Sequence, residues 1–93
     1  MPKLNGLLHQ NLRLAIMSFL VTVEITDFKK LMEVTEATKG NLSAQLSKLE
    51  AAEYLEVKKS FKGKYPHTEY NITKVGKAEL KTYINHVKLL LNI

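Results

Sequence analysis

Lysine side chains gather between residues 58 and 77, and a cluster of amines is the chemistry of a surface that attracts anions. This segment holds six lysines and one acid, Glu69, so it carries a net charge of +5. Eight basic and eight acidic residues cancel over the rest of the chain. Charge concentrated in this way favours a localised basic surface that binds a polyanion. A solvated lysine face without a partner is the alternative.

A helix expected over residues 39–52, with Thr38 as its cap, leads toward this segment. Leu42, Leu46 and Leu49 share one narrow arc and predict its buried side. Small or polar outward residues near the start of a helix let its backbone approach the major groove of DNA closely. The candidate DNA contacts on and before this helix are Thr38, Lys39, Gly40, Asn41, Ser43, Ala44, Gln45 and Lys48. Asn41 and Gln45 could each offer a donor and an acceptor to an adenine edge, whereas residues that simply face water are the alternative.

A β-hairpin is expected over residues 55–73, with strands at 55–61 and 68–73 and a connecting loop from Lys62 to His67. Its candidate DNA contacts are the lysines and two residues expected at the tip: Lys58, Lys59, Lys62, Lys64, Tyr65 and His67. Lysine is a point charge without the planar fork of arginine. The hairpin therefore suits attraction to phosphates, with release of counterions, better than reading of bases.

The remaining apolar periodicity predicts a first helix over residues 4–23, a very short strand at 24–26, a second helix over 27–34 and a last helix over 74–91. Thr26 or Asp27 is expected to cap the second helix, and Thr73 the last one. The first and last helices each carry more leucine than one buried stripe needs. Packing against a second copy would cover the surplus, so the terminal helices predict a homodimer.

Composition limits the other classes of function. A chain of 93 residues without internal repeats is expected to form one domain, 1–93, and the lack of cysteine excludes disulfides and thiolate metal sites. No apolar run reaches the length of a membrane span, and we expect a soluble cytoplasmic protein. The three histidines are scattered, so neither catalysis, a cofactor nor a metal is expected. A metal site of Glu79, His86 and His9 across a dimer is the disfavoured exception.

The order helix, short strand, helix, turn, helix, hairpin, helix resembles the α+β winged helix-turn-helix domain with a three-helix core, a hairpin wing and a long C-terminal helix. More specifically, the chain resembles the compact winged-helix transcriptional regulators related to the MarR and ArsR families. The residues that carry this resemblance are Phe28, Leu31, Lys39 to Ser43, Leu46, Leu49, Glu50, Tyr54, Leu55, Ile72, Thr73 and Gly76. The resemblance implies a regulator that binds double-stranded DNA, with residues 39–52 as the recognition helix and 55–73 as the wing.

Two departures from these families are informative. Glu53 stands where they commonly have glycine, the residue that accepts a left-handed helix end without strain. Larger MarR proteins carry further terminal helices that shape an effector pocket, so a small-molecule effector is left open. Three functions fit the residues: a sequence-specific regulator, which is favoured, a non-specific architectural DNA-binding protein, or a winged-helix module that binds proteins.

Overall fold

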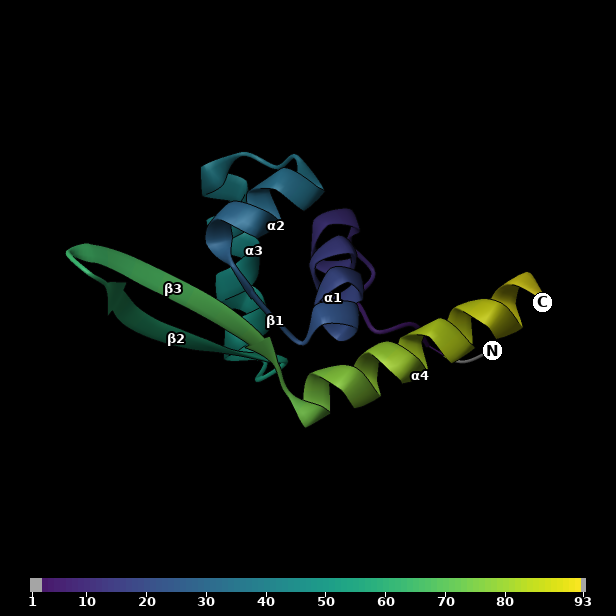
Figure 1. The fold of residues 1–93 in the computed structure, drawn as a ribbon. Coiled ribbons are helices and arrows are strands. Elements are labelled where there is room, and N and C mark those ends of the chain that lie inside the picture. The colour runs from purple at the N-terminus through teal and green to yellow at the C-terminus, as the bar shows by residue number, and fades with distance from the viewer. Residues whose placement is uncertain (1–2, 93) are drawn as a thin grey trace.

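The computed structural model describes residues 3–92, so Met1, Pro2 and Ile93 of the expected domain lie outside the described residues. Its elements in chain order are α1 (Asn11–Val23), β1 (Ile25–Asp27), α2 (Phe28–Thr35), α3 (Lys39–Ala51), β2 (Leu55–Lys62), β3 (Tyr65–Ile72) and α4 (Lys74–Leu91) (Figure 1). Helices α1, α2 and α3 form the core, and the hairpin and α4 extend from it to opposite sides. The α+β winged-helix fold expected from the sequence is confirmed.

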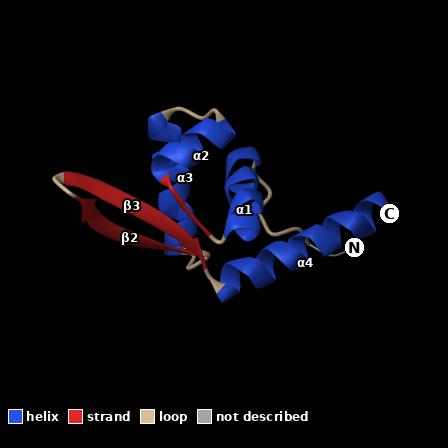
Figure 2. Cartoon of the chain, viewed as in Figure 1, coloured by secondary structure: helices blue, strands red, loops and turns tan. Residues whose placement is uncertain are grey.

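The three strands form one antiparallel sheet in the order β1-β3-β2. Leu55 lies opposite Ile72, and Val57 lies opposite Tyr70, as the alternation of apolar residues predicts. Figure 2 shows β2 and β3 continuing as a two-stranded ribbon beyond the helices. The expected six-residue loop is wrong, because the strands run on until only Gly63 and Lys64 connect them. Gly63 has a φ of 64°, which glycine adopts without steric cost.

The first helix begins at Asn11, so its expected start at Leu4 is wrong. The Asn5 side chain closes a turn instead, because its Oδ1 accepts hydrogen bonds from the backbone N–H groups of Leu7 and Leu8. Gln10 then caps the helix by accepting from the N–H of Arg13 at 2.7 Å. Leu8 is fully buried although it lies in this turn. The apolar spacing therefore continued upstream of the helix because the turn also faces the core.

Side chains of this N-terminal turn bind it to the rest of the fold. The Asn5 amide donates to the hydroxyl of Tyr54 at 2.7 Å and to Glu79 Oε2 at 3.2 Å. His9 Nδ1 lies 2.8 Å from the hydroxyl of Tyr83 on α4. These contacts hold α4 against the core up to about its middle, and the C-terminal part of α4 projects away from the core in Figure 1.

Three of the four helices end at or next to a glutamate with a left-handed backbone. Glu24 follows α1 with a φ of 68°, Glu36 follows α2 with a φ of 56°, and Glu53 follows α3 with a φ of 64°. Residues other than glycine are strained in this region. Glu24 has a compensating contact, because Lys77 Nζ lies 2.9 Å from its Oε1 and this hydrogen bond lowers the pKa of the Glu24 carboxyl.

The last helix is joined to the end of α3 by close backbone contacts. Thr73 donates its N–H to the carbonyl of Tyr54 at 3.1 Å and its hydroxyl to the carbonyl of Glu53 at 2.7 Å. The Thr73 hydroxyl oxygen also accepts from the N–H of Gly76, so Thr73 caps α4 as expected. A Cβ on Gly76 would overlap the Tyr54 carbonyl oxygen and stand 3.0 Å from Met17 Cε. Glycine is therefore required at this contact.

Gly76→Ala should lower the free energy of unfolding by about 1–3 kcal/mol, because the added methyl group must displace backbone rather than a flexible side chain. Urea unfolding followed by circular dichroism measures the change. Gly40→Ala is the matched control, since nothing lies within 4 Å of a Cβ built there and alanine favours a helix. Equal stabilities of the two variants would contradict the close contact at Gly76.

Glu53→Gly should raise the free energy of unfolding by about 1 kcal/mol, because glycine removes the strain of the positive φ. The melting temperature should rise accordingly. Glu56→Gly is the control, because this residue lies in strand β2, where glycine should lower the melting temperature. A melting temperature unchanged or lowered by Glu53→Gly would show that the helix end is not strained.

Candidate nucleic-acid interface

The outward side of α3 is built as the sequence predicts for seven of its eight candidate residues. Thr38 caps the helix by accepting from the N–H of Asn41 at 3.2 Å. The seven exposed candidates are Thr38, Lys39, Gly40, Asn41, Ser43, Ala44 and Lys48. Leu42, Leu46 and Leu49 are buried on the opposite side. The start of α3 therefore presents a surface of small and polar groups with a lysine at each end.

Gln45 departs from this arrangement, and its expected outward orientation is wrong. Its side chain is only 8% exposed, although it is polar. Gln45 Oε1 accepts from Arg13 Nη1 at 2.5 Å, and its Nε2 donates to Asn41 Oδ1 at 3.0 Å. Both ends of the amide are thus paired inside the protein, which removes the cost of burying it. Gln45 supports the surface from beneath and does not lie on it.

Arg13 is the residue of this region that sequence reasoning missed. Its Nε donates to the carbonyl of Leu7 at 2.6 Å, so it connects the N-terminal turn to α3 through Gln45. Arg13 is the sole arginine in a chain with thirteen lysines. The use of arginine at this one position was the sign in the sequence that Arg13 pairs within the protein, because only arginine presents several donors in a fixed planar fork.

The wing carries its lysines on both faces of the ribbon. Residues directly opposite each other in an antiparallel pair share a face, and the faces alternate along each strand. Lys59 therefore shares the face of Val57 and Tyr70, whereas Lys58 and Lys62 lie on the other face. All four candidate lysines of the wing, Lys58, Lys59, Lys62 and Lys64, are exposed. The charge surrounds the ribbon instead of lying on one side of it.

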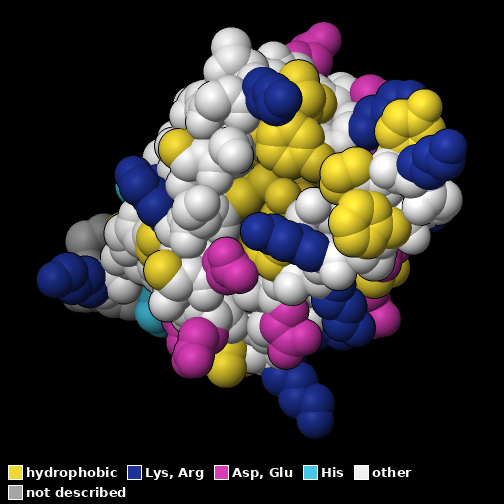
Figure 3. Space-filling model, turned by 90° about the vertical axis from the view of Figure 1, so that its left-hand side faces the viewer, with side chains coloured by type: hydrophobic (Ala, Val, Ile, Leu, Met, Phe, Trp, Pro, Cys, Tyr) yellow, Lys and Arg dark blue, Asp and Glu magenta, His cyan; other side chains and the backbone are white. Residues whose placement is uncertain are grey.

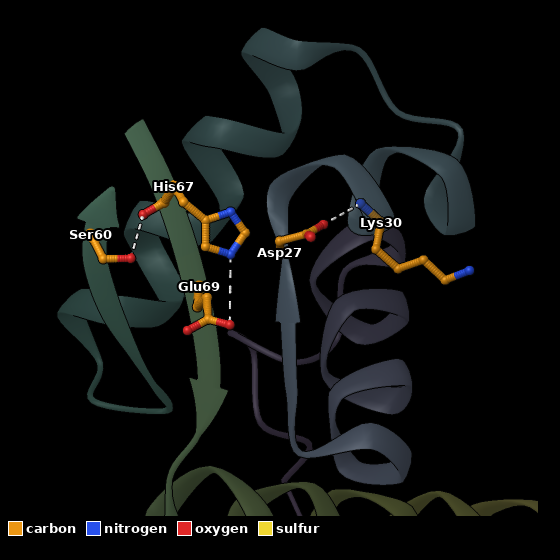
Figure 4. Close-up of polar contacts among 5 residues, drawn as sticks. All are labelled: Asp27, Lys30, Ser60, His67 and Glu69. Carbon is orange, nitrogen blue, oxygen red and sulfur yellow. Dashed lines mark hydrogen bonds and ion pairs between the residues drawn. The ribbon is translucent and has the colours of Figure 1, made fainter. Parts of the chain in front are cut away.

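The tip of the wing differs in part from the expectation. Tyr65 is 78% exposed beside the turn, as predicted, and its neighbour Phe61 is 74% exposed. His67 is not at the tip, because the longer strand places it within β3. Its side chain is 18% exposed and turns toward Asp27, and its Nε2 lies 3.7 Å from Glu69 Oε2 (Figure 4). The same view shows Asp27 capping α2 at the N–H of Lys30 and the hydroxyl of Ser60 donating to the His67 carbonyl.

The +5 segment does not form a single patch. Lys74 and Lys77 begin α4 at the base of the hairpin, roughly 25 Å from the turn by the rise of an eight-residue strand. Lys77 is also paired with Glu24. The localised basic surface expected from charge counting is therefore limited to the four wing lysines.

The start of α3 and the wing border one hollow. Its lining comes from four elements: Asp27 at the end of β1, Phe28, Lys29, Met32 and Glu33 of α2, Lys39 and Ser43 of α3, and Pro66, His67, Thr68 and Tyr70 of β3. Figure 3 shows hydrophobic side chains gathered in a hollow on the face toward which the wing projects, with basic and acidic side chains around it. Lys29 was missed by sequence reasoning, which used α2 only for its buried side. Helix α3 and the wing thus share one molecular surface.

This arrangement defines a winged helix-turn-helix domain, with α2 and α3 as the helix pair and β2 and β3 as the wing. The chain belongs to the winged helix DNA-binding domain family, whose model matches residues 12–91. An uncharacterized protein of Methanocaldococcus jannaschii is 37% identical over 76 residues, which cover 81% of this chain and 82% of that protein. The family and the fold together identify a winged-helix DNA-binding domain, which implies DNA as its partner.

Solved structures give the same fold. A transcriptional regulator homologue from Pyrococcus horikoshii superposes with a TM-score of 0.88 at 27% identity and covers 95% of this chain and 87% of its own. The ytfH protein of Salmonella typhimurium gives a TM-score of 0.75 at 18% identity, covering 90% of this chain and 74% of its own, and shows the fold alone.

Two further features bear on other classes of function. Among the described residues, no three histidine, aspartate or glutamate side chains gather closely enough to hold a metal ion. No helix within residues 3–92 has both the length and the apolar character needed to cross a membrane.

Proposed function

We propose that this protein is a sequence-specific regulator of the compact MarR and ArsR type, non-enzymatic and cytoplasmic, that binds double-stranded DNA as a homodimer. Helix α3 enters the major groove, and the wing lies along the phosphate backbone or the adjacent minor groove. One observation carries the proposal: Lys39 and Ser43 of α3 border the same hollow as Pro66 and Thr68 of the wing. One duplex could therefore contact both elements at once.

The start of α3 would supply the contacts that depend on sequence. Gly40 and Ala44 lack long side chains, so the helix backbone can come close to base edges. Asn41 and Lys48 reach outward from positions two helical turns apart. Thr38 accepts from the N–H of Asn41 but keeps its hydroxyl proton to donate to a phosphate oxygen. Lys39 and Ser43 complete the set beside the hollow.

The wing would supply affinity that does not depend on sequence. Its lysines lie on both faces of a narrow ribbon, so the ribbon can enter between two phosphate chains and be attracted to each. Each phosphate neutralised releases counterions, which makes binding weaken steeply with salt. Exposed Tyr65 beside the turn can reach sugar or phosphate.

Neutralising Lys59 and Lys62 together, as Lys59→Gln with Lys62→Gln, should make the negative slope of log K against log salt shallower by about two. Fluorescence anisotropy with a mixed-sequence duplex at several salt concentrations measures this slope. Lys3→Gln with Lys74→Gln is the matched control, since it removes the same charge from two exposed positions that lie outside the wing and do not line the groove between α1 and α4. Equal slopes for the two double variants would show that the wing does not contact phosphates.

The homodimer is supported by apolar surface on the terminal helices. Helix α1 exposes Val21 and Val23, and α4 exposes Ile84, Leu89, Leu90 and Leu91. Val21, Leu80 and Ile84 also line a groove between the two helices, bordered by Lys77, Lys81 and Lys88. A second copy related by a two-fold axis would cover this surface. Two recognition helices about 34 Å apart would then face successive major grooves of a palindromic site.

Ile84→Glu should convert the dimer to a monomer, because a carboxylate would have to be buried in an apolar contact. Sedimentation equilibrium at micromolar concentration measures the molecular mass. Val34→Glu is the control, since Val34 on α2 is 43% exposed and Ile84 is 40% exposed. A wild-type protein that is already monomeric at this concentration would remove the dimer from the proposal.

A non-specific architectural DNA-binding protein is the second candidate, favoured by the exclusive use of lysine in the wing. Genomic fragments competed with bulk DNA distinguish the two: retention of discrete fragments supports the regulator, and uniform loss supports the architectural role. A module that binds proteins is the third reading. Neutralising all four wing lysines would leave its partner binding intact.

A further inference from the structure

Three side chains connect the interior of the protein to the DNA-facing surface. Arg13 Nη1 donates to Gln45 Oε1 at 2.5 Å, and Gln45 Nε2 donates to Asn41 Oδ1 at 3.0 Å. Gln45 is buried and Arg13 is partly buried, whereas Asn41 is exposed on the outward side of α3. Gln45 is the one polar side chain that is buried among the described residues. A buried amide with both ends paired has a fixed orientation of its oxygen and its nitrogen. This orientation determines which atom of the Asn41 amide faces Gln45.

The direction of this chain of hydrogen bonds is set by chemistry at its inner end. A guanidinium has five N–H donors and no acceptor, so it can face only the oxygen of the Gln45 amide. The nitrogen of Gln45 must then face Asn41, and the oxygen of Asn41 must accept the hydrogen bond. Reversing Gln45 would bring two donors together at Arg13, whose Nε is held by the Leu7 carbonyl at 2.6 Å.

We propose that Arg13 and Gln45 are positioning residues that make Asn41 a hydrogen-bond donor toward DNA and so direct it to guanine. With Oδ1 turned toward Gln45 Nε2, the group of the Asn41 amide that faces outward is its NH2. Guanine presents two acceptors, N7 and O6, in the major groove, whereas adenine requires one donor and one acceptor from the same amide. This inference rests on the proposed function, because it assumes that α3 reads the major groove. It replaces the adenine contact that asparagine and glutamine suggest in the sequence.

Gln45→Glu tests the inference directly. A carboxylate still accepts from Arg13, but it has no N–H for Asn41, so the Asn41 amide must turn its NH2 inward and its oxygen outward. The preferred base should change from guanine to one that offers a donor, adenine or cytosine, with a shift in relative preference of about tenfold. Selection from duplexes randomised over the bound site, followed by sequencing, measures the preference at each position.

Matched variants separate base reading from charge and from folding. Gln10→Glu adds the same charge at the other glutamine of the chain, where the oxygen that caps α1 is kept, and should leave the preferred base unchanged. Asn41→Ala should remove the guanine preference at one position only. Arg13→Met keeps a long apolar stem without donors, frees Gln45 to reverse, and should reduce the guanine preference about tenfold. This variant serves also if Gln45→Glu does not fold.

The outcomes distinguish this inference from the proposed function. The inference is supported if the wild-type protein selects a guanine that Asn41→Ala no longer selects and that Gln45→Glu replaces by adenine or cytosine. A selected sequence that Gln45→Glu and Arg13→Met leave unaltered overturns the inference and keeps the regulator. A wild-type protein that selects no sequence overturns both. In the DNA-free protein, NMR should show slower hydrogen exchange for the Gln45 side-chain amide than for that of Asn41, and equal rates would overturn the inference independently of DNA.

Discussion

The position of the wing depends on the junction where the end of α3 meets the end of β3. The Tyr54 carbonyl accepts from the N–H of Thr73, and the Thr73 hydroxyl donates to the Glu53 carbonyl. Leu55 and Ile72 then pair directly opposite each other at the base of the hairpin. These contacts fix the direction in which the ribbon leaves α3. Without them, nothing would hold the wing lysines and α3 on one surface.

The same junction explains why the chain tolerates strain there. Glu53 holds a positive φ so that Tyr54 can turn back and donate its N–H to the Leu49 carbonyl at 3.0 Å. Gly76 allows α4 to touch the Tyr54 backbone on the other side. A glycine would relieve the strain at Glu53, but it would also loosen the segment that aims the wing. The stability of the fold and the orientation of the wing are therefore set by the same few residues.

Much of this architecture could be predicted from local patterns, because apolar periodicity and capping residues act over a few positions. Thr38 and Thr73 cap their helices as predicted, Asp27 is the one of two predicted candidates that caps α2, and the pairing of Leu55 with Ile72 follows from alternation. The errors arose where a side-chain hydrogen bond or a strand pairing overrides the periodic pattern. Leu4 to Gln10 continue a helical spacing, yet the Asn5 side chain closes a turn there. His67 was expected in a loop, but pairing continues as far as Tyr65.

Gln45 shows the limit of sequence reasoning at the site itself. On a helical projection it lies beside Leu42 and Leu49, at the border between the buried and outward sides, and an amide there is ordinarily assigned to solvent. Its partner, Arg13, is 32 residues away, and nothing local indicates the contact. Burying an amide is costly unless both of its ends are paired. An apolar residue would have filled this position more simply. The pairing holds the Asn41 amide in one orientation, with Oδ1 toward Gln45, and the proposed reading of guanine depends on this orientation.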